Sequence, residues 1–427
     1  MKICFKTLGC RVNLYETDAL ASRFHEAGWD ISTEGDADVY VVNTCTVTNM
    51  SDQKSRQFLH QIRREHGDAL IIATGCMVNH RKQELIDSGI VDYVVDNEHK
   101  HAIFDIVTDH FADNIASLEN YDPDLFAYSP AFDTFHTRSL VKIHDGCNNF
   151  CSYCIIPMVR GRATSRPDTD IYQNITELVS HGFKEIVLTG VNMGRYKYNN
   201  IDFEQLIKNI LSIDGDFRVR ISSIEPDNFS DDFIRLFDNE KLAPHMHICL
   251  QSGCNRTLFN MRRHYNTAQF REMCRKIMAA VPHFNITTDV IVGFPQESDE
   301  DFKQSADFCK ELGFSHIHTF KYSKRSFTKA AVMEGQISET TKTERSAVIR
   351  QISAENRQKY FSQMLGKPQK MLIERIDSEG FSRGYGENYI PIKLKHKGLE
   401  RNTFVDVILD GIIEKGDDSE MTGHILR

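Results

Sequence analysis

Alternation of strands and helices is the feature that most constrains the fold of this 427-residue chain. In its first third, apolar runs that fit buried strands end at Cys10, Cys45 and Cys76, and helical patterns such as YETDALASRFHEAG lie between them. Continuous apolar strands separated by helices indicate a parallel sheet covered on both faces. We therefore predict an α/β domain built on a parallel sheet over residues 1–130.

The middle of the chain repeats the alternation six times. Candidate strands include SLVKIHDG, EIVLTGVN and ITTDVIVGFP, and helical stretches such as IDFEQLIKNILS lie between them. Six strand–helix units are two short of the closed eight-stranded barrel. We therefore predict an open, partial barrel over residues 138–340.

The last part of the chain changes character. A charged helical run over residues 341–366 is predicted to be a linker helix, and short strands with glycine-bearing turns follow it. Such strands favour a small β-barrel, which we expect over residues 367–427. Small barrels of this kind often bind RNA through aromatic and basic groups. The candidates are Tyr385, Tyr389, Lys393, Lys395 and Lys397. The alternative is a solvated basic edge strand.

Three cysteines within eight residues form the first candidate metal site. Cys147, Cys151 and Cys154 have the spacing C-x3-C-x2-C, which can aim three thiolates at one inorganic cluster. Iron–sulfur clusters with complete protein ligation take four cysteines, and structural zinc sites also close with four ligands. Three ligands therefore leave one position open for a reactant. The alternative is a disulfide pair with a spare thiol, or three buried cysteines.

A second set of three cysteines follows the strands of the first third. Cys10, Cys45 and Cys76 each come just after a predicted strand. The carboxyl ends of parallel strands share one edge of the sheet, where ligands collect. We therefore predict a second three-thiolate site at that edge, against the alternative that each is an ordinary small buried residue.

The rule that ligands collect at the carboxyl ends of parallel strands also applies to the central strands. It predicts that six residues lie around one mouth of the partial barrel: Cys147, Gly190, Asn192, Glu225, Gln251 and Gly293. Each residue alone is weak evidence for a binding site, because a carboxylate is often only solvated and a glycine often only turns the chain. Their shared position at strand ends predicts a binding site.

Composition narrows the class of protein. A net charge of −9 argues against non-specific binding of nucleic acid. Eleven cysteines in so long a chain argue against the disulfide framework of a small secreted protein. The opening MKICFKTLGC lacks a signal-peptide pattern, and no apolar stretch approaches the roughly 18 residues of a membrane span. We expect a cytoplasmic protein.

The motifs taken together resemble a known family. HDGCNNFCSYC resembles the signature of the radical S-adenosylmethionine enzymes. With GCRVNLYETD, VNTCTVTN and TGC upstream and a TRAM-like barrel at the end, the whole chain resembles the radical S-adenosylmethionine methylthiotransferases. It is most similar to the members that act on N6-threonylcarbamoyladenosine in tRNA. Departures at Met77–Asn79 and Thr164 bear on the second cluster's surroundings and on RNA contacts.

The resemblance implies two 4Fe–4S clusters and S-adenosylmethionine as cofactors, with no catalytic side chain beyond the cluster-bound cofactors. The first cysteine set would hold the cluster that binds S-adenosylmethionine, and the second would hold the cluster that carries the sulfur. Tyr153 would lie near the adenine, Gly190 and Asn192 near the methionyl amino group, Glu225 at the ribose and Gly293 on the adenine side.

The resemblance also implies the reaction and the partners. The expected reaction is radical insertion of a methylthio group at carbon 2 of N6-threonylcarbamoyladenosine, at adenosine 37 beside the anticodon. The expected partners are tRNA and an electron donor such as flavodoxin or ferredoxin. Phosphate contacts are expected from Arg160, Arg162 and Arg166, unless these are only solvated. The alternatives are isopentenyladenosine or a ribosomal-protein aspartate as acceptor, or a non-catalytic RNA-binding metal protein.

Overall fold

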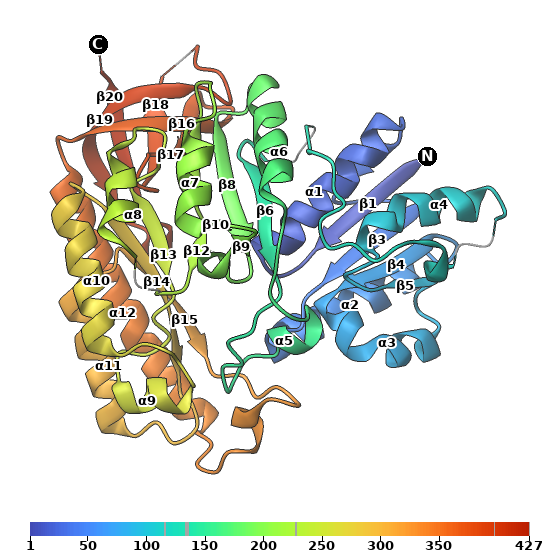
Figure 1. The fold of residues 1–427 in the computed structure, drawn as a ribbon, viewed down its shortest axis with the longest axis horizontal. Coiled ribbons are helices and arrows are strands. Elements are labelled where there is room, and N and C mark those ends of the chain that lie inside the picture. The colour runs from blue at the N-terminus through green and yellow to red at the C-terminus, as the bar shows by residue number, and fades with distance from the viewer. Residues whose placement is uncertain (115–116, 133–135, 227–228, 397, 427) are drawn as a thin grey trace.

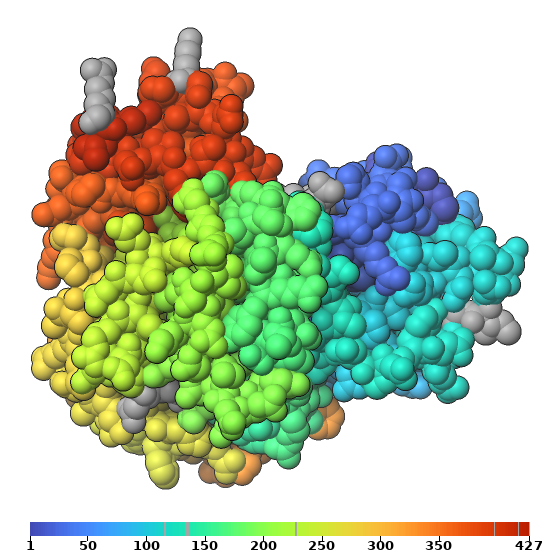
Figure 2. All heavy atoms as spheres, turned by 45° about the horizontal axis from the view of Figure 1, so that its top comes forward, coloured from blue at the N-terminus to red at the C-terminus, as the bar shows by residue number. Residues whose placement is uncertain are grey.

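The computed structural model describes residues 1–114, 117–132, 136–226, 229–396 and 398–426. The chain forms an N-terminal sheet, a central half-barrel and a C-terminal closed barrel, coloured from blue through green to red in Figure 1. The closed barrel lies over one end of the central part, and the N-terminal part lies beside it (Figure 2). Among the described residues, no helix has the length and apolar character needed to cross a membrane.

The N-terminal sheet has five parallel strands in the order β2-β1-β3-β4-β5. The three apolar runs form the three central strands, as predicted. The two edge strands were not predicted, because they have only three residues each. The strands are β1 Lys2–Thr7, β2 Asp30–Ser32, β3 Val39–Thr44, β4 Leu70–Gly75 and β5 Tyr93–Val95. The helices are α1 Arg11–Glu26, α2 Asn49–Glu65, α3 Cys76–Ser88 and α4 Ile103–Phe111.

The central part confirms the predicted open half-barrel. Its parallel strands form two sheets, β11-β8-β6-β7 and β12-β13-β14-β15, with the short β7 pairing antiparallel at one edge. The predicted strand FRVRISSIEP breaks at Ser222 into β11 and β12, so one continuous segment joins the two sheets. The strands are β6 Ser139–Asp145, β7 Thr164–Ser165, β8 Glu185–Gly190, β11 Arg218–Ile221, β12 Ser223–Ile224, β13 His245–Ile248, β14 Asn285–Val292 and β15 His316–Lys321.

Helices cover the outside of the half-barrel (Figure 1). Their apolar faces pack on the strands in one large core that includes Ile175, Leu206, Phe270 and Phe308. The helices are α5 Ile156–Val159, α6 Asp168–Ser180, α7 Phe203–Leu211, α8 Asp231–Arg235, α9 Asn255–Asn260, α10 Thr267–Ala280 and α11 Asp299–Leu312. The hairpin β9 Lys197–Tyr198 and β10 Ile201–Asp202 precedes α7.

The segment expected to be a linker is the helix α12, Glu339–Met364, which packs against the half-barrel. Ile349 and Ile352 are buried in the central core. The Ser353 hydroxyl accepts a hydrogen bond from the Ile317 backbone at 2.9 Å, and the Asn356 amide donates to the Cys309 carbonyl at 3.0 Å. The helix therefore belongs to the outer layer of the central part and does not act as a spacer.

The C-terminal segment is a closed five-stranded barrel in the order β16-β17-β18-β20-β19. The barrel was predicted, but its strand with the sequence FSRGY was not, because this segment contains a glycine and few apolar residues. The strands are β16 Pro368–Ile376, β17 Phe381–Tyr385, β18 Pro391–Lys395, β19 Phe404–Ile413 and β20 Glu420–Ile425.

Buried arginines of the central sheet attach the closed barrel to it. Arg218 donates to the Lys370 carbonyl at 2.8 Å, and Arg220 donates to the Glu387 carbonyl at 3.0 Å. Both guanidinium groups also pair with the Glu185 carboxylate, at 2.5 and 2.7 Å. Burial by itself would raise the pKa of Glu185, but the two arginines hold it well below its usual range. The barrel is therefore an integral part of the molecule, since removing it would take four backbone acceptors away from these two arginines.

Candidate active site

The first cysteine triad lies on the loop between β6 and α5. The loop begins with Gly146, whose φ of +66° favours glycine. A Cβ atom at this position would lie 1.9 Å from the Arg162 carbonyl oxygen, so no larger residue fits. The backbone N–H of Cys147 donates to the Gly161 carbonyl at 3.2 Å. The loop is thus closed by the segment that follows α5.

Hydrogen-bond donors face the sulfur atoms of the first triad. The Asn192 amide lies 3.6 Å from Cys147 Sγ, and Arg263 Nη1 lies 3.2 Å from Cys151 Sγ. Burial, followed by the neighbouring Cys151, raises the pKa of Cys154 to about 12. A metal bound here must therefore displace a proton from Cys154. The Ile156 backbone N–H and the charge of Arg263 partly offset the rise in the pKa of Cys154.

Three of the predicted cofactor-binding residues converge on the first triad. Asn192 touches Cys147, and its buried Oδ1 has no hydrogen-bond partner among the described residues. Tyr153 Oη lies 3.5 Å from Arg263 Nη1, and Glu225 pairs with the other terminal nitrogen of the same guanidinium. An orphaned acceptor and a carboxylate beside three thiols fit a ligand that carries amino and hydroxyl groups. Arg263 was not predicted, because the segment NMRRHY that contains it matches no motif.

The two predicted glycines lie at crowded strand ends. A Cβ at Gly190 would lie 2.9 Å from the His144 carbonyl oxygen. At Gly293, which has a φ of +70°, a Cβ would lie 2.3 Å from the Lys342 side chain. Gly293 is next to Phe294, which packs in one apolar cluster with Tyr153. Gly190 therefore allows β8 to pack closely against β6, and Gly293 allows the end of β14 to lie against the Lys342 side chain of α12.

The second cysteine triad is assembled by three loops of the N-terminal sheet. Cys10 caps the N-terminus of α1, Cys76 is the first residue of α3, and Cys45 follows β3. Glycine keeps the loops close: a Cβ at Gly9 would lie 2.9 Å from Cys45 Sγ, and one at Gly75 would lie 2.4 Å from the carbonyl oxygen before Cys45. The positive ends of two helices favour negative charge at this point.

The thiols of the second triad interact electrostatically with one another. Burial, with smaller effects of Cys10 and Cys45, raises the pKa of Cys76 to about 11. Cys10 is exposed, whereas Cys45 and Cys76 are buried. The site is thus enclosed on one side and open on the side of Cys10.

The spacing of the sulfur atoms bears on the kind of metal. In the described part of the chain, one group of three ligand atoms lies within 4.8 Å of one another, that of His247, Cys249 and Asp289, and neither triad is so compact. Three sulfurs bound to a single zinc ion at about 2.3 Å each must be closer together than that. In this structure neither triad has the spacing that a single bound zinc ion would impose.

A cavity of 710 Å³ connects the second triad with the inner face of the half-barrel. Its volume lies in the range of sites that hold drug-sized ligands, about 300–1,000 Å³. The walls come from all three parts of the chain, and they include Cys10, Cys45, Cys76, Gly190, His247, Asp289, His318, Tyr385 and Tyr389.

Histidines of β13 and β15 form one wall of this cavity. His247 lies 3.2 Å from Asp289 and 3.1 Å from the Thr287 hydroxyl. Burial, with the adjacent Arg357, lowers the pKa of His316 to about 3, and burial also lowers that of His318. His316 and His318 are therefore neutral hydrogen-bonding groups. Alternating histidines in HMHI and HIHT mark this wall in the sequence, because alternate residues of a strand face the same side.

Comparison with known proteins gives the family. Residues 2–96 match the uncharacterized protein family UPF0004, and residues 141–309 match the radical SAM superfamily. The chain is 38% identical over 416 residues to the threonylcarbamoyladenosine tRNA methylthiotransferase MtaB of Bacillus subtilis, covering 93% of this chain and 91% of that protein. The chain belongs to the radical S-adenosylmethionine methylthiotransferases.

Two further likenesses place the methylthiotransferase among its relatives. It is 31% identical to the tRNA-2-methylthio-N(6)-dimethylallyladenosine synthase of Thermodesulfovibrio yellowstonii, covering 90% of each chain. Its fold resembles that of the radical S-adenosylmethionine methyltransferase TsrM from Kitasatospora setae, with a TM-score of 0.56 and 14% identity over 78% of this chain and 77% of that one. The protein is accordingly an enzyme that uses a 4Fe–4S cluster and S-adenosylmethionine.

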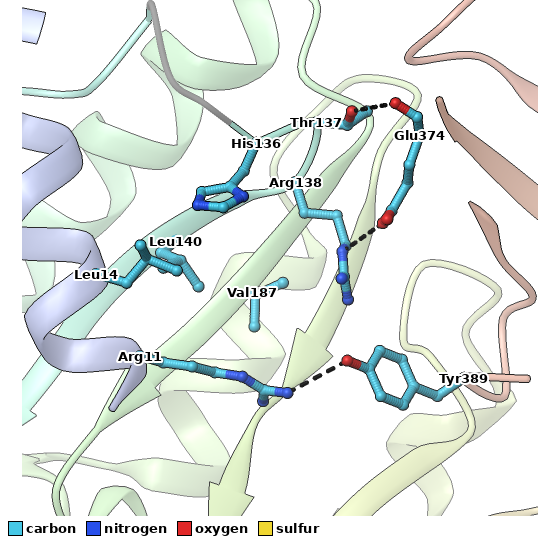
Figure 3. Close-up of a pocket in the computed structure, with 9 residues that line it drawn as sticks. All are labelled: Arg11, Leu14, His136, Thr137, Arg138, Leu140, Val187, Glu374 and Tyr389. Carbon is cyan, nitrogen blue, oxygen red and sulfur yellow. Dashed lines mark hydrogen bonds and ion pairs between the residues drawn. The ribbon is translucent and has the colours of Figure 1, made fainter. Parts of the chain in front are cut away.

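The predicted aromatic pair of the methylthiotransferase faces inward, toward the cavity. The rings of Tyr385 and Tyr389 stack at 4.6 Å, and Tyr389 stacks in turn on His245 at 4.8 Å. Arg11, next to Cys10, donates to the Tyr389 hydroxyl at 3.4 Å (Figure 3). Lys393 and Lys395 lie elsewhere on the barrel, with their ammonium groups 3.9 and 5.5 Å from the ring centre of Phe381. The candidate Lys397 lies outside the described residues.

The three predicted phosphate-contacting arginines have different environments. Arg160 is buried and pairs with Glu16 and Asp145, so the prediction that it contacts RNA is wrong in this structure. Arg166 is also buried and donates to the Tyr15 hydroxyl at 3.3 Å. Arg162 is exposed and lies over the Phe150 ring. Basic residues after the signature motif thus serve mostly to join the N-terminal and central parts.

Proposed function

We propose that this methylthiotransferase inserts a methylthio group at carbon 2 of N6-threonylcarbamoyladenosine, at adenosine 37 of tRNA. The observation that supports this most is the single cavity bounded by the second cysteine triad, by strand ends of the half-barrel and by the closed barrel. A nucleoside there would face the second triad, which would hold the source of the sulfur. It would also border Gly190, two residues before Asn192, which contacts the first triad. The likeness to the Bacillus subtilis MtaB favours the threonylcarbamoyl substrate.

In this proposal the two triads hold two clusters with different tasks. Cys147, Cys151 and Cys154 would hold the 4Fe–4S cluster at which S-adenosylmethionine binds, and Cys10, Cys45 and Cys76 would hold the second. When bound, the first cluster and S-adenosylmethionine supply a carbon radical that can abstract hydrogen from an unactivated C–H bond. The protein positions and encloses the reactants.

Side chains around the first triad would position S-adenosylmethionine. The orphaned Asn192 carbonyl oxygen would accept from its amino group, Glu225 would accept from the ribose hydroxyls, and Tyr153 would border the adenine. Glu225 pairs with Arg263 in this structure, so it must exchange that partner or share it. The backbone of Gly190 and Gly293 would border the ligand.

Binding of tRNA would use the outer surface and the inner wall of the cavity. Exposed Arg162 and half-buried Lys393 are the remaining candidates for phosphate contacts. Tyr385 and Tyr389 would border the adenosine inside the cavity. The proposal includes a cytoplasmic location and an electron donor such as flavodoxin or ferredoxin.

Mass spectrometry of tRNA nucleosides from cells with and without the gene tests the substrate. We expect the 2-methylthio derivative of N6-threonylcarbamoyladenosine to disappear and its unthiolated precursor to accumulate. Loss of a methylthio-isopentenyladenosine instead would assign the activity named for the Thermodesulfovibrio yellowstonii relative. Loss of a modified ribosomal aspartate would identify a protein substrate.

Iron content tests the ligand assignment. Replacing Cys147, Cys151 and Cys154 together with alanine should halve the iron bound after anaerobic reconstitution and abolish cleavage of S-adenosylmethionine. Replacing Cys10, Cys45 and Cys76 should also halve the iron but leave some reductive cleavage. Full iron in either triple variant would reject the corresponding ligands. The buried Cys274, replaced by alanine, is the control and should leave the iron unchanged.

A further inference from the structure

A network of five buried charged side chains joins the N-terminal and central parts next to the second triad. Glu16 of α1 pairs with Lys100, with Lys142 at 2.8 Å and with Arg160 at 3.1 Å. Asp145 pairs with Lys142 at 2.5 Å and with Arg160 at 2.8 Å. All five side chains are at most 1% exposed, so water does not screen them.

The network contains three cations and only two carboxylates. The other acceptors of these cations are neutral: Asn13 for Arg160 at 2.5 Å, Asn43 for Lys100 at 3.2 Å and the Leu125 carbonyl for Lys142 at 2.9 Å. One positive charge is therefore in excess in a buried site. A buried charge without a counter-charge is costly, by several kcal/mol per ion.

A second buried network shows how excess charge is handled elsewhere in this chain. Arg218 and Arg220 share the single carboxylate of Glu185. There the guanidinium groups also donate to four backbone carbonyls of the closed barrel. The network at Glu16 has one backbone carbonyl and two amide oxygens in their place. It has fewer neutral acceptors for the same excess charge.

The second triad lies beside the network and can supply further negative charge when its thiols are ionised. Arg160 acts electrostatically on Cys45 and Cys76, and Lys100 acts on Cys76. Asn13 links the two sites directly, since its amide donates to the Leu8 and Thr44 carbonyls, each one or two residues from a triad cysteine. The excess positive charge therefore lies against the wall that the three thiols form.

We propose that this network is a fixed counter-charge for the second 4Fe–4S cluster, holding its thiolates and raising its reduction potential. The proposal rests on the assignment of Cys10, Cys45 and Cys76 as ligands. A cluster held by three thiolates is anionic, and reduction adds one more negative charge. A buried cation nearby thus stabilises the reduced form more than the oxidised form. Lys100 and Glu16 would change the reduction potential of the cluster through their charges, without taking part in the reaction themselves.

The test measures the midpoint potential of the second cluster in the full-length chain. The background carries alanine at Cys147, Cys151 and Cys154, so that only the second cluster is loaded. Lys100→Met removes a positive charge and should lower the potential, whereas Glu16→Gln removes a negative charge and should raise it. One charge on the order of 10 Å away, at an effective dielectric constant of about 20, changes the reduction equilibrium about tenfold. That factor corresponds to about 59 mV for one electron.

Opposite signs distinguish a charge effect from a structural one. The double variant Lys100→Met/Glu16→Gln should return close to the potential of the background, because its net charge is restored. Shifts of the same sign, or no shift with full iron, would overturn this proposal alone. Absence of iron from the background would overturn the ligand assignment as well. If Lys100→Met does not fold, Lys142→Met supplies the same loss of charge and the same expected sign.

Discussion

Gly75→Ala tests whether close packing of three loops builds the second triad. Gly75 has φ +95° and ψ −171°, a region of backbone conformation that is essentially restricted to glycine. Holding another residue there costs about 1–3 kcal/mol. An added Cβ would lie 2.4 Å from the Thr44 carbonyl oxygen and 2.7 Å from Asn43 Oδ1. The loop that carries Cys45 must therefore move.

The expected loss of stability can be compared with that at a matched glycine. Relieving the steric overlap adds about 1–3 kcal/mol, as for overpacking elsewhere, so Gly75→Ala should lower the free energy of unfolding by about 2–6 kcal/mol. Gly89, at the other end of α3, also has a positive φ, +63°, but a Cβ there meets nothing within 4 Å. Gly89→Ala should lower the free energy of unfolding only by the cost of the left-handed backbone conformation, about 1–2 kcal/mol.

The assay combines urea unfolding of the apoprotein with iron analysis after reconstitution. Gly75→Ala should bind about half of the normal iron, because the second triad is displaced and the first is not. Gly89→Ala should bind the full amount. Equal losses of stability in the two variants, with full iron in both, would refute the idea that this close approach assembles the site.

Three further predictions follow from buried charges and exposed cations. Burial raises the pKa of Asp18 to about 7, so its carboxyl favours folding at low pH and is destabilising once ionised. Asp18→Asn should therefore gain stability over the wild type between about pH 4 and pH 7, reaching about 4 kcal/mol at pH 8; a pH-independent difference in urea unfolding would contradict this. Glu185→Gln leaves Arg218 and Arg220 without a counter-charge and should cost about 3–5 kcal/mol, measured by thermal unfolding; a loss below about 1 kcal/mol would contradict it. Arg162→Ala should flatten the dependence of log Kd for tRNA on log salt by about 0.7–0.9, and an unchanged slope would remove Arg162 from the interface.

Strand ends were predictable because they depend on local pattern. Apolar runs mark strands buried in a parallel sheet, and the carboxyl ends of such strands must share one edge. That rule alone placed Cys10, Cys45 and Cys76 together, although 66 residues separate the first from the last. Glycines at positions 9 and 75 are consistent with it, since crowded loops need residues without a Cβ.

Pairing between distant elements was decided only by the tertiary structure. Arg160 follows a signature motif, and its sequence context predicts an exposed cation. In the structure it is buried between the N-terminal and central parts, where it pairs with Glu16, 144 residues away. Tyr385 and Tyr389 were predicted to lie on an RNA-binding surface of the barrel. In the structure Tyr389 stacks on His245, and both tyrosines line the cavity. Local pattern specifies which face of an element is buried but not which charged group meets it there. That partner depends on how the three parts pack against one another.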